Sequence, residues 1–462
     1  MKRSLINHIL ILTLFLASNF WASDSYASFS LIRDAETEKF LHKIADPIFK
    51  AADLDPKNIR IFIVNDSSLN AFVSGGQNVF LNTGLIRKYA TPDTLIGVIA
   101  HETGHIASGH LARSSEAMEQ AGNAMILSYL LGIGALVAGA PEAGQALIFG
   151  GTDSAQRLYL KYNRGQEEAA DQRAVEYLQK MSYPATGLIE LLEVFDRQMV
   201  GYKGQIDEYL LSHPVSKKRI SLIKNLTADQ KFSDKKINSK LQSDMDTVLA
   251  KLEGYMDNPE KTLQKYKNKH DRLSLYKKSI ALSKQGKISE SLKLLDKVIA
   301  KTDKNKQSQL GFLLELKGQV LFESGNIFDS IVTYNKALKL LKGRDSSQAK
   351  ISFSAAILAL PKEDKELINL ALKNLEESKK YENDNPFLFK QLATAYSKKG
   401  NKGMSLLALA EFNLLIGKYE KCIKYAGNAK EKLAKTDKIN RLHADDLIQA
   451  AKKEKDKKKP SL

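Results

Sequence analysis

Cysteine is nearly absent from this sequence: Cys422 is the only one among 462 residues. A single thiol excludes an intrachain disulfide framework and any metal cluster held by several cysteines. Metal chemistry in this chain must therefore use histidine, aspartate and glutamate. The hydrophobic content of 43% and the charged content of 27% are ordinary for a folded protein and argue against wholesale disorder.

Arginine is scarce in the second half of the chain. Residues 226–462 contain 48 basic and 30 acidic side chains, and 45 of the basic ones are lysine, in a chain whose net charge is +17. A surface that binds phosphate groups favours arginine, and no nucleic-acid-binding motif is present. We therefore interpret the basic surplus as compositional, with attraction of an anionic membrane face or of acidic clients as the alternative.

The first 27 residues have the three-part layout of a secretory signal peptide. Two basic residues at 2–3 precede an apolar run over 9–17, and small residues occupy the −3 and −1 positions of a cut after Ala27. We therefore expect the mature chain to be exported. A cut after Ala22 and an uncleaved membrane anchor are the alternatives.

Residues 28–225 are expected to form a helix-rich α+β domain. The periodicity of apolar residues and the turn residues predict its main elements. These are a helix over 33–53, a strand over 59–64, a hairpin of 71–73 and 78–82 across Gly75 and Gly76, a helix over 94–113 capped by Asp93, and a helix over 166–181.

Helical hairpins are expected over residues 269–450, after a polar linker at 226–268 and before a solvated charged tail at 451–462. Glycines lie between apolar-periodic segments at positions 286, 325, 400 and 417. The spacing within 318–337 follows the 34-residue tetratricopeptide pattern. Because one hairpin cannot bury its apolar face alone, we expect the units to stack into an α-solenoid with a concave binding side. A generic helical bundle is the alternative.

Residues 120–141 form a run of 22 residues without a charged side chain. The run is long enough to span a membrane, but it contains five glycine or proline residues and lacks a flanking basic anchor. We therefore favour an apolar helical hairpin or lid, with membrane contact as the alternative.

The segment His101-Glu102-Thr103-Gly104-His105 lies inside the predicted apolar helix. Residues at i and i+4 share one helical face, so both imidazoles can bind the same metal ion. Glu102 lies one step round the helix, from where it can reach a water without ligating the ion. Burying these three side chains without a partner would be costly, which favours a metal site over a structural role.

A third ligand is expected from the helix that contains Glu167 and Asp171, which are spaced i, i+4 on one face. Glu167 would bind the metal, and Asp171 would accept a hydrogen bond from the outer nitrogen of a ligating imidazole. Glu168 is the alternative ligand, although it lacks an acidic partner one turn on. His110 points off the ligand face and is expected to be a structural or surface residue.

These motifs resemble the Ste-type CAAX prenyl protease and heat-shock protease superfamily of gluzincin metallopeptidases. The family's HExxH motif is matched at 101–105, and its ExxxD motif at 167–171. Residues 70–86 (NAFVSGGQNVFLNTGLI) resemble the strand-and-turn segment that precedes the zinc helix. Residues 212–220 (SHPVSKKRI) resemble the family's His-Pro-x4-Arg segment.

The resemblance implies a mainly α protein, in which a zincin-like α+β metallopeptidase domain precedes a tetratricopeptide-repeat solenoid. It implies one zinc ion per chain, with His101, His105 and Glu167 as ligands. Glu102 matches the general base and Asp171 the acid that orients a ligand. Zinc held by three side chains keeps one position open for water, whose proton Glu102 would take during attack on a peptide carbonyl.

Two further roles near the zinc are hypotheses. An unpaired sheet edge at Asn78, Val79, Phe80, Leu81 and Asn82 would hold substrate as an added strand, with an ordinary sheet strand as the alternative. His213 would lie near the zinc, either as a latch on its open position or as an oxyanion donor, and Arg219 would position the same segment. A hydrogen-bonded histidine at a helix start is the alternative for His213.

The predicted function is therefore that of a periplasmic zinc metalloendopeptidase. The resemblance implies a role in outer-membrane protein quality control, with misfolded or stalled outer-membrane proteins as substrates and the β-barrel assembly machinery as a partner of the repeats. A non-catalytic or latched chaperone or adaptor is the competing interpretation. A third is a basic scaffold with peripheral contact to the membrane or envelope, the outer membrane included.

Overall fold

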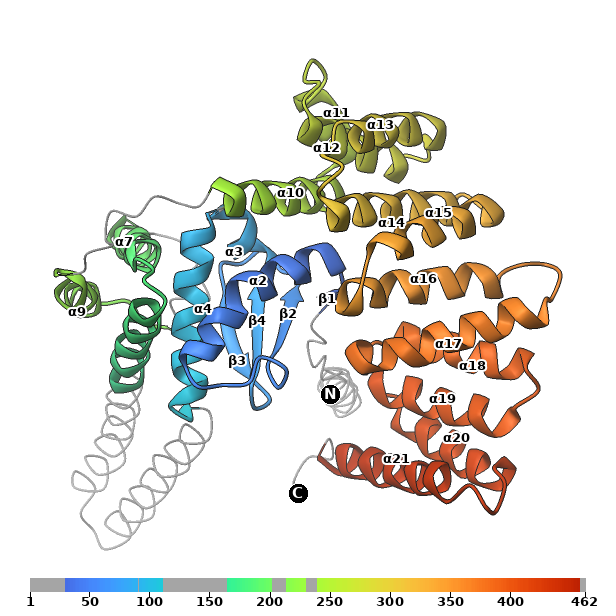
Figure 1. Cartoon of the computed structure of the whole chain (residues 1–462). Helices are drawn as coiled ribbons and strands as arrows, with labels where there is room; N and C mark the ends of the chain where they lie inside the picture. The colour runs from blue at the N-terminus through green and yellow to red at the C-terminus, as the bar shows by residue number, and fades with distance from the viewer. Residues whose placement is uncertain (1–29, 90, 111–163, 202–212, 230–238, 458–462) are drawn as a thin grey trace, which may run out of the picture.

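The computed structural model describes residues 30–89, 91–110, 164–201, 213–229 and 239–457. An N-terminal unit that contains a sheet is followed by an array of helices that curves beside it (Figure 1). The predicted signal peptide (1–27) and the uncharged run (120–141) lie outside the described residues. Among the described helices, none has both the length and the apolar character that a membrane span requires.

A four-stranded sheet lies at the centre of the N-terminal unit. Its strands are β1 (Leu31–Ile32), β2 (Arg60–Val64), β3 (Ala71–Ser74) and β4 (Asn78–Asn82), in the spatial order β1-β2-β4-β3. β3 and β4 form the predicted antiparallel hairpin. Gly75 and Gly76 turn between them with φ values of 58° and 96°, which glycine adopts without a Cβ clash.

The predicted substrate edge at Asn78–Asn82 is wrong. β4 has partners on both sides, because it pairs with β2 in parallel and with β3 in antiparallel orientation. Val79, for example, lies opposite Ile61 on one side and Val73 on the other. Its backbone groups are therefore used within the sheet and cannot take an added strand. The hairpin is visible in the sequence, but the insertion of β4 between β2 and β3 depends on non-local packing.

Helix α2 (Ala35–Ala51) covers the sheet and packs against α4 (Pro92–Ala107). The predicted stripe on α2 is buried, with at most 4% of each side chain exposed at Phe40, Leu41, Ile44, Ile48 and Phe49. The unit also contains α3 (Thr83–Lys88), a helix over 164–180, α7 (Thr186–Gly201) and α9 (Lys217–Thr227). Apolar side chains from these helices and from the sheet form one continuous core.

The predicted ends of α4 need correction. The side-chain oxygen of Thr91, and not Asp93, caps the helix by accepting a hydrogen bond from the Thr94 amide at 3.3 Å. Asp93 lies in the first turn and accepts from the Tyr183 hydroxyl instead. The helix ends at Ala107 rather than near Arg113. Thr91 precedes a proline at the first helical position, a common arrangement for a helix start.

The segment predicted as a polar linker contains two helices, α10 (Ser239–Met256) and α11 (Pro259–Lys265). Met245, Val248 and Leu252 of α10 are buried in the core of the N-terminal unit. The sequence looks polar because α10 also carries buried polar groups, such as Lys251, that are paired with charges from α2. α10 therefore belongs to the N-terminal unit and leads directly into the repeats.

The predicted helical hairpins extend from α12 to α21, and neighbouring helices pack against one another along the array (Figure 1). The four predicted turn glycines all have positive φ values, between 70° and 84°. Within the tetratricopeptide-like pattern, a Cβ on Gly318 would lie 2.8 Å from the Tyr334 ring, which explains the glycine there. The helices are α12 (Arg272–Lys284), α13 (Ile288–Ala300), α14 (Gln307–Glu323), α15 (Ile327–Leu340), α16 (Ser347–Leu358), α17 (Lys365–Glu382), α18 (Pro386–Lys398), α19 (Lys402–Leu415), α20 (Tyr419–Lys432) and α21 (Lys438–Lys457), with a short 3-10 turn η1 (Gly343–Ser346) before α16.

The mainly α architecture is as predicted, with an α+β unit followed by a solenoid of helical hairpins. The charged tail begins later than expected, because α21 continues through Lys457. Ala451 is fully buried on this helix, so the residues after 450 still contribute to packing.

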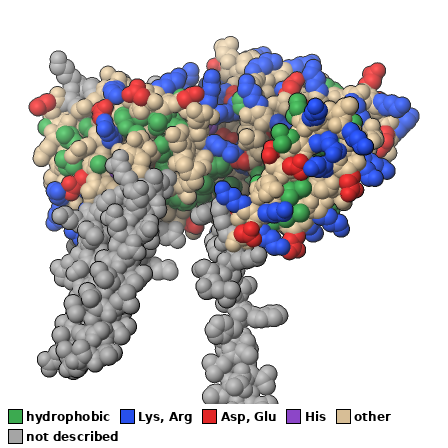
Figure 2. All heavy atoms as spheres, turned by 90° about the horizontal axis from the view of Figure 1, so that it is seen from below, with side chains coloured by type: hydrophobic (Ala, Val, Ile, Leu, Met, Phe, Trp, Pro, Cys, Tyr) green, Lys and Arg blue, Asp and Glu red, His purple; other side chains and the backbone are tan. Residues whose placement is uncertain are grey.

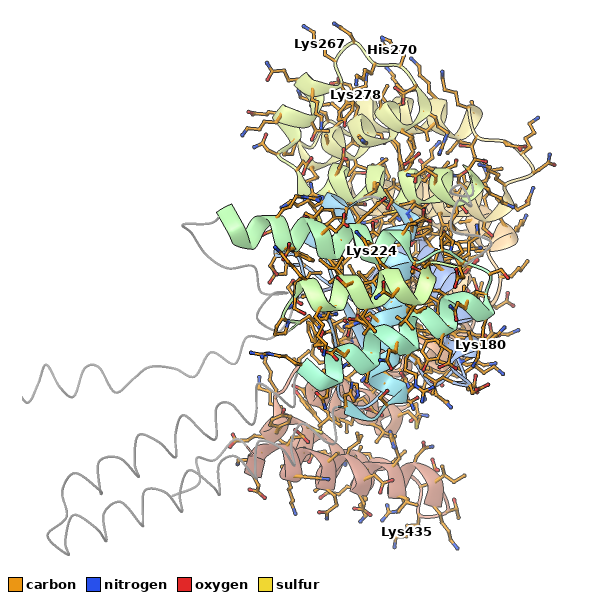
Figure 3. All side chains as sticks on the ribbon, turned by 90° about the vertical axis from the view of Figure 1, so that its left-hand side faces the viewer. Lys180, Lys224, Lys267, His270, Lys278 and Lys435 are labelled. Carbon is orange, nitrogen blue, oxygen red and sulfur yellow. The ribbon has the colours of Figure 1, made fainter. Side chains whose placement is uncertain are left out.

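The basic surplus is spread over the surface. Figure 2 shows Lys and Arg side chains interspersed with acidic ones over the face seen from below. In Figure 3, Lys180 and Lys224 lie on the N-terminal unit, Lys267 and Lys278 at one end of the repeats, and Lys435 at the other. Lys224 is paired with Glu193 at 2.6 Å. This distribution fits a compositional lysine surplus better than a single phosphate-binding face.

Candidate metal centre

Helix α4 places His101 and His105 side by side, with their Nε2 atoms 3.1 Å apart. Both side chains are buried, and they lie on the same face because they are separated by about one helical turn. Gly104 lets the next helix approach, since a Cβ at this position would be 2.7 Å from the carbonyl oxygen of Ala170. This close packing brings the helix over 164–180 to the histidines.

Glu167 on that helix completes the predicted donor set. Its Oε2 lies 3.3 Å from His101 Nε2, and its Oε1 lies 3.2 Å from His105 Nε2. Ligand atoms of these three residues and of His213 all lie within 4.8 Å of one another. Two or three imidazoles and one carboxylate around a single point form a donor set that suits zinc. The residues therefore fit the metal that the sequence implies.

Glu102 lies beside these donors and is completely buried. Among the described residues, neither of its carboxylate oxygens has a hydrogen-bond partner. His213 lies beside this carboxylate, with its Nε2 3.5 Å from Glu102 Oε1. Burial is the largest influence on this group and raises its pKa, although His213 and His101 oppose the rise. A carboxylate with a raised pKa and unused acceptors is suited to take a proton from water.

The carboxylate of Asp171 lies beside the His101 ring. Its Oδ1 lies 2.9 Å from His101 Nδ1, the ring nitrogen that faces away from the other donors. Arg219 donates two hydrogen bonds to the same carboxylate, at 2.7 and 2.9 Å. Burial alone would raise the pKa of Asp171, but Arg219 and His101 lower it, so the group stays ionised. An ionised partner fixes the imidazole orientation that metal binding needs.

His213 comes from the segment before α9 and is buried at the same point. Its Nδ1 lies 3.2 Å from both Glu167 oxygens and 3.4 Å from His101 Nε2. Arg219 holds this segment, because it donates to the carbonyl oxygen of Pro214 at 3.0 Å and pairs with Glu167 at 2.8 Å. The structure thus brings His213 among the predicted ligands, in the turn that precedes α9.

Two nearby residues have different roles. Glu168, the alternative ligand, points outward and accepts from Lys218 at 2.7 and 2.9 Å. His110 is buried, and its Nδ1 lies 2.9 Å from His105 Nδ1, so it contacts the ring of the second histidine of the motif. The sequence pointed to a structural residue and missed this contact, because His110 follows the left-handed Gly109 and leaves the path of α4.

The imidazoles differ in charge when no metal is bound. Burial would lower the pKa of His101, but hydrogen bonds to Asp171 and Glu167 raise it to about 10. The pKa of His105 falls to about 3, chiefly because of burial. For Glu167, burial would raise the pKa, but His213 and the two imidazoles hold it well below its usual range. These shifts favour a proton on His101 beside an ionised Glu167 when no metal is bound, and a metal ion competes with that proton.

The comparisons with known proteins agree with this geometry. Residues 34–227 match the family model of peptidase family M48. The chain is 28% identical over 209 residues to a β-barrel assembly-enhancing protease of Yersinia pestis, a match that covers 45% of this chain and 42% of the relative. It is 26% identical over 197 residues to the Escherichia coli K12 protein of the same name, covering 42% and 40%.

Both matches span less than half the length of these relatives. A solved structure of a MamA RS-1 ArsTM double mutant is 17% identical to this chain, covers 44% of it and 98% of its own length, and has a TM-score of 0.27. The match to the family model spans the residues that carry both motifs and His213. The similarity to peptidase family M48 therefore covers residues 34–227, the part of the chain that contains the candidate metal centre.

Proposed function

We propose that this protein is a zinc metalloendopeptidase with His101, His105 and Glu167 as zinc ligands. The observation that carries the proposal is the buried Glu102 carboxylate, which has no hydrogen-bond partner among the described residues and lies beside the convergent donors. Zinc bound there would supply a Lewis acid that polarises a peptide carbonyl and acidifies water. Glu102 takes the proton of the attacking water and returns it to the leaving amine.

His213 acts as a latch in this proposal. Its ring nitrogen approaches the two Glu167 oxygens and His101 Nε2, which supports a place among the ligands over a place as oxyanion donor. Catalysis then requires the segment of His213 to move, since substrate and latch compete for one position. Arg219 joins this segment to Asp171 and Glu167, and so connects the latch with the ligands.

We further propose that the protein works in the periplasm, with misfolded or stalled outer-membrane proteins as substrates. The support is the similarity to relatives named β-barrel assembly-enhancing proteases. In this proposal the repeats bind the β-barrel assembly machinery or its clients. The second candidate is a latched chaperone or adaptor, which the buried position of His213 favours.

Metal content and casein cleavage of the mature protein, beside a Glu102→Gln variant, test the enzyme directly. We expect one zinc per chain in both proteins and cleavage only by the parent, because the substitution removes the base but no ligand. Zinc in both with cleavage in neither would favour the adaptor. Absence of zinc would refute the proposal, and removal of zinc by a chelator must abolish cleavage.

A further inference from the structure

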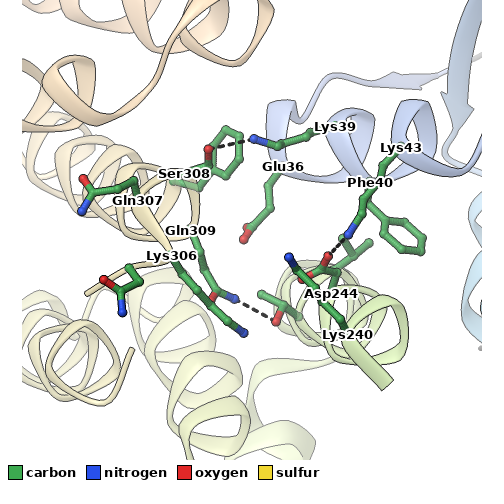
Figure 4. A pocket seen from close by; sticks show the side chains of 14 residues that line it. Glu36, Lys39, Phe40, Lys43, Lys240, Asp244, Lys306, Gln307, Ser308 and Gln309 are labelled. Atoms are coloured by element: carbon green, nitrogen blue, oxygen red, sulfur yellow. Dashed lines mark hydrogen bonds and ion pairs between the residues drawn. The ribbon is translucent and has the colours of Figure 1, made fainter. Parts of the chain in front are cut away.

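A cavity of about 410 Å³ lies between the peptidase domain and the repeats (Figure 4). Its walls come from α2, from α10 and from the turn that leads into α14. None of its lining residues belongs to the metal centre. An occupant would therefore contact both parts of the molecule without touching the catalytic groups.

Positive charge predominates around this cavity. Lysines 39, 43, 240 and 306 contribute to the lining, against Glu36 and Asp244. Figure 4 shows Lys39 reaching Ser308 and Lys43 reaching Asp244, at 2.8 and 2.5 Å. Lys306, by contrast, forms no ion pair with any residue in the described part of the chain. It therefore offers an unneutralised ammonium group at the entrance to α14.

The acidic side of the lining is partly neutralised. Glu36 accepts from the Tyr276 hydroxyl at 3.1 Å and lies 3.5 Å from Lys251 Nζ. Burial is the largest influence on Glu36 and raises its pKa, with Lys251 opposing. Because Lys43 already neutralises Asp244, this carboxylate does not strongly repel an anionic group of a ligand in the cavity.

The rest of the lining is apolar or amide-bearing. Phe40, Val248 and Phe312 form its apolar part and are almost completely buried. Gln307 and Gln309 contribute amides, and Gln309 already donates to Thr247 at 3.1 Å. Aromatic rings beside lysines suit a ligand that carries an apolar group next to an anionic one.

We propose that this cavity binds an acidic segment of a polypeptide, in which a carboxylate lies next to an apolar side chain. A flat membrane surface fits less well, because the apolar part of the lining is recessed between two domains. A nucleic acid fits less well, since the lining mixes acids with lysines and contains no arginine. The site does not depend on the proposed peptidase activity, so binding can be measured without cleavage.

Fluorescence anisotropy with the full chain tests the site. The probe is a labelled ten-residue peptide that alternates phenylalanine with aspartate, and its control has asparagine in place of aspartate. We expect the acidic peptide to bind more tightly, with an affinity that falls as salt rises. Lys306→Glu should weaken its binding about five- to tenfold, by an energy close to that of surface ion pairs. The matched control is Lys304→Glu, two residues away and outside the cavity lining.

A second measurement uses the position of the cavity between two domains. A ligand that contacts both should raise the thermal midpoint of the full chain, and Lys306→Glu should reduce this rise. Equal binding of the two peptides, or equal effects of the Lys306 and Lys304 variants, would overturn the proposal. Binding of anionic phospholipid vesicles that Lys306→Glu weakens, with no binding of the acidic peptide, would assign the lysines to a membrane surface instead.

Discussion

At the residue scale, His213 lies among the predicted ligands, where it would compete with substrate. Its Nδ1 is 3.2 Å from the carboxylate of Glu167, and its side chain is almost fully buried. If it is a latch, His213→Ala should raise casein cleavage about tenfold or more, because the closed state loses one ligand while the three predicted ligands remain. Zinc content should stay unchanged.

The control for this prediction is His270→Ala, which removes an exposed histidine of the repeats. Cleavage that decreases in the His213 variant, with zinc retained, would assign the residue to oxyanion stabilisation. Cleavage equal to that of the parent would remove both roles.

The charge state of the two histidines predicts a pH dependence of stability. The pKa of His101 is raised from 6.5 in the unfolded chain to about 10 in the folded, metal-free centre. Between these values the folded state binds a proton that the unfolded state lacks, so the free energy of unfolding decreases as pH rises. Zinc requires neutral imidazoles, so the zinc-loaded protein lacks this contribution of the His101 proton to the free energy of unfolding.

We therefore expect the thermal midpoint of the chelator-treated protein to fall between pH 7 and pH 9 relative to that of the zinc-loaded protein. Calorimetry of both forms across this range measures the difference. A constant gap between the two midpoints would show that His101 is neutral without metal. His105 affects stability at acidic pH instead. Its pKa is lowered from 6.5 to about 3 by folding, so the unfolded chain binds a proton first and the free energy of unfolding decreases as pH falls below 6.5.

At the scale of elements, the packing of α4 against the helix over 164–180 determines whether the ligands meet. Gly104→Ala would place a methyl group 2.7 Å from the Ala170 carbonyl oxygen. Separating the helices should cost about 1–3 kcal/mol of stability and weaken zinc binding. Chemical denaturation and a zinc competition assay measure the two effects.

Gly165→Ala is the matched control. It lies on the facing helix, two residues from Glu167, and a Cβ there would meet nothing within 4 Å. Replacement of an exposed helical glycine should leave zinc binding unchanged and stabilise the chain by about 0.5–1 kcal/mol. If both variants bound zinc equally well, helix separation would not control the ligand geometry.

The elements also show which parts of the site the sequence could predict. The i, i+4 spacings of His101 with His105 and of Glu167 with Asp171 determine shared faces by helical geometry alone, so these side chains were found. The contact of His110 with His105 depends on a turn after α4. The central place of β4 depends on which strands meet, and α10 looked like a linker because its buried Lys251 pairs with Asp34 and Glu36. Such non-local contacts leave no periodic pattern in the sequence from which they could be predicted.

At the scale of the whole molecule, ionic contacts connect the peptidase domain to the repeats. Arg33, just before α2, pairs with Glu382 at 2.8 Å and with Asp384 at 3.1 Å, at the end of α17 and beyond. Arg60 on β2 also pairs with Asp384. In the apolar cluster shared with α14, α15 and α16, Ala35 is the only residue of the peptidase domain among those that the structure describes. This contact therefore relies on charge more than on apolar burial.

Arg33→Met should therefore loosen the docking of the repeats, because it leaves the buried Glu382 carboxylate without its cation. We expect a loss of about 1–3 kcal/mol and a larger radius of gyration by small-angle scattering. Arg173→Met is the control, since Arg173 is exposed and pairs with Glu176 on its own helix. A radius unchanged by either substitution would mean that α10 and the chain connection hold the two parts together, and that the ionic contacts only adjust their fit.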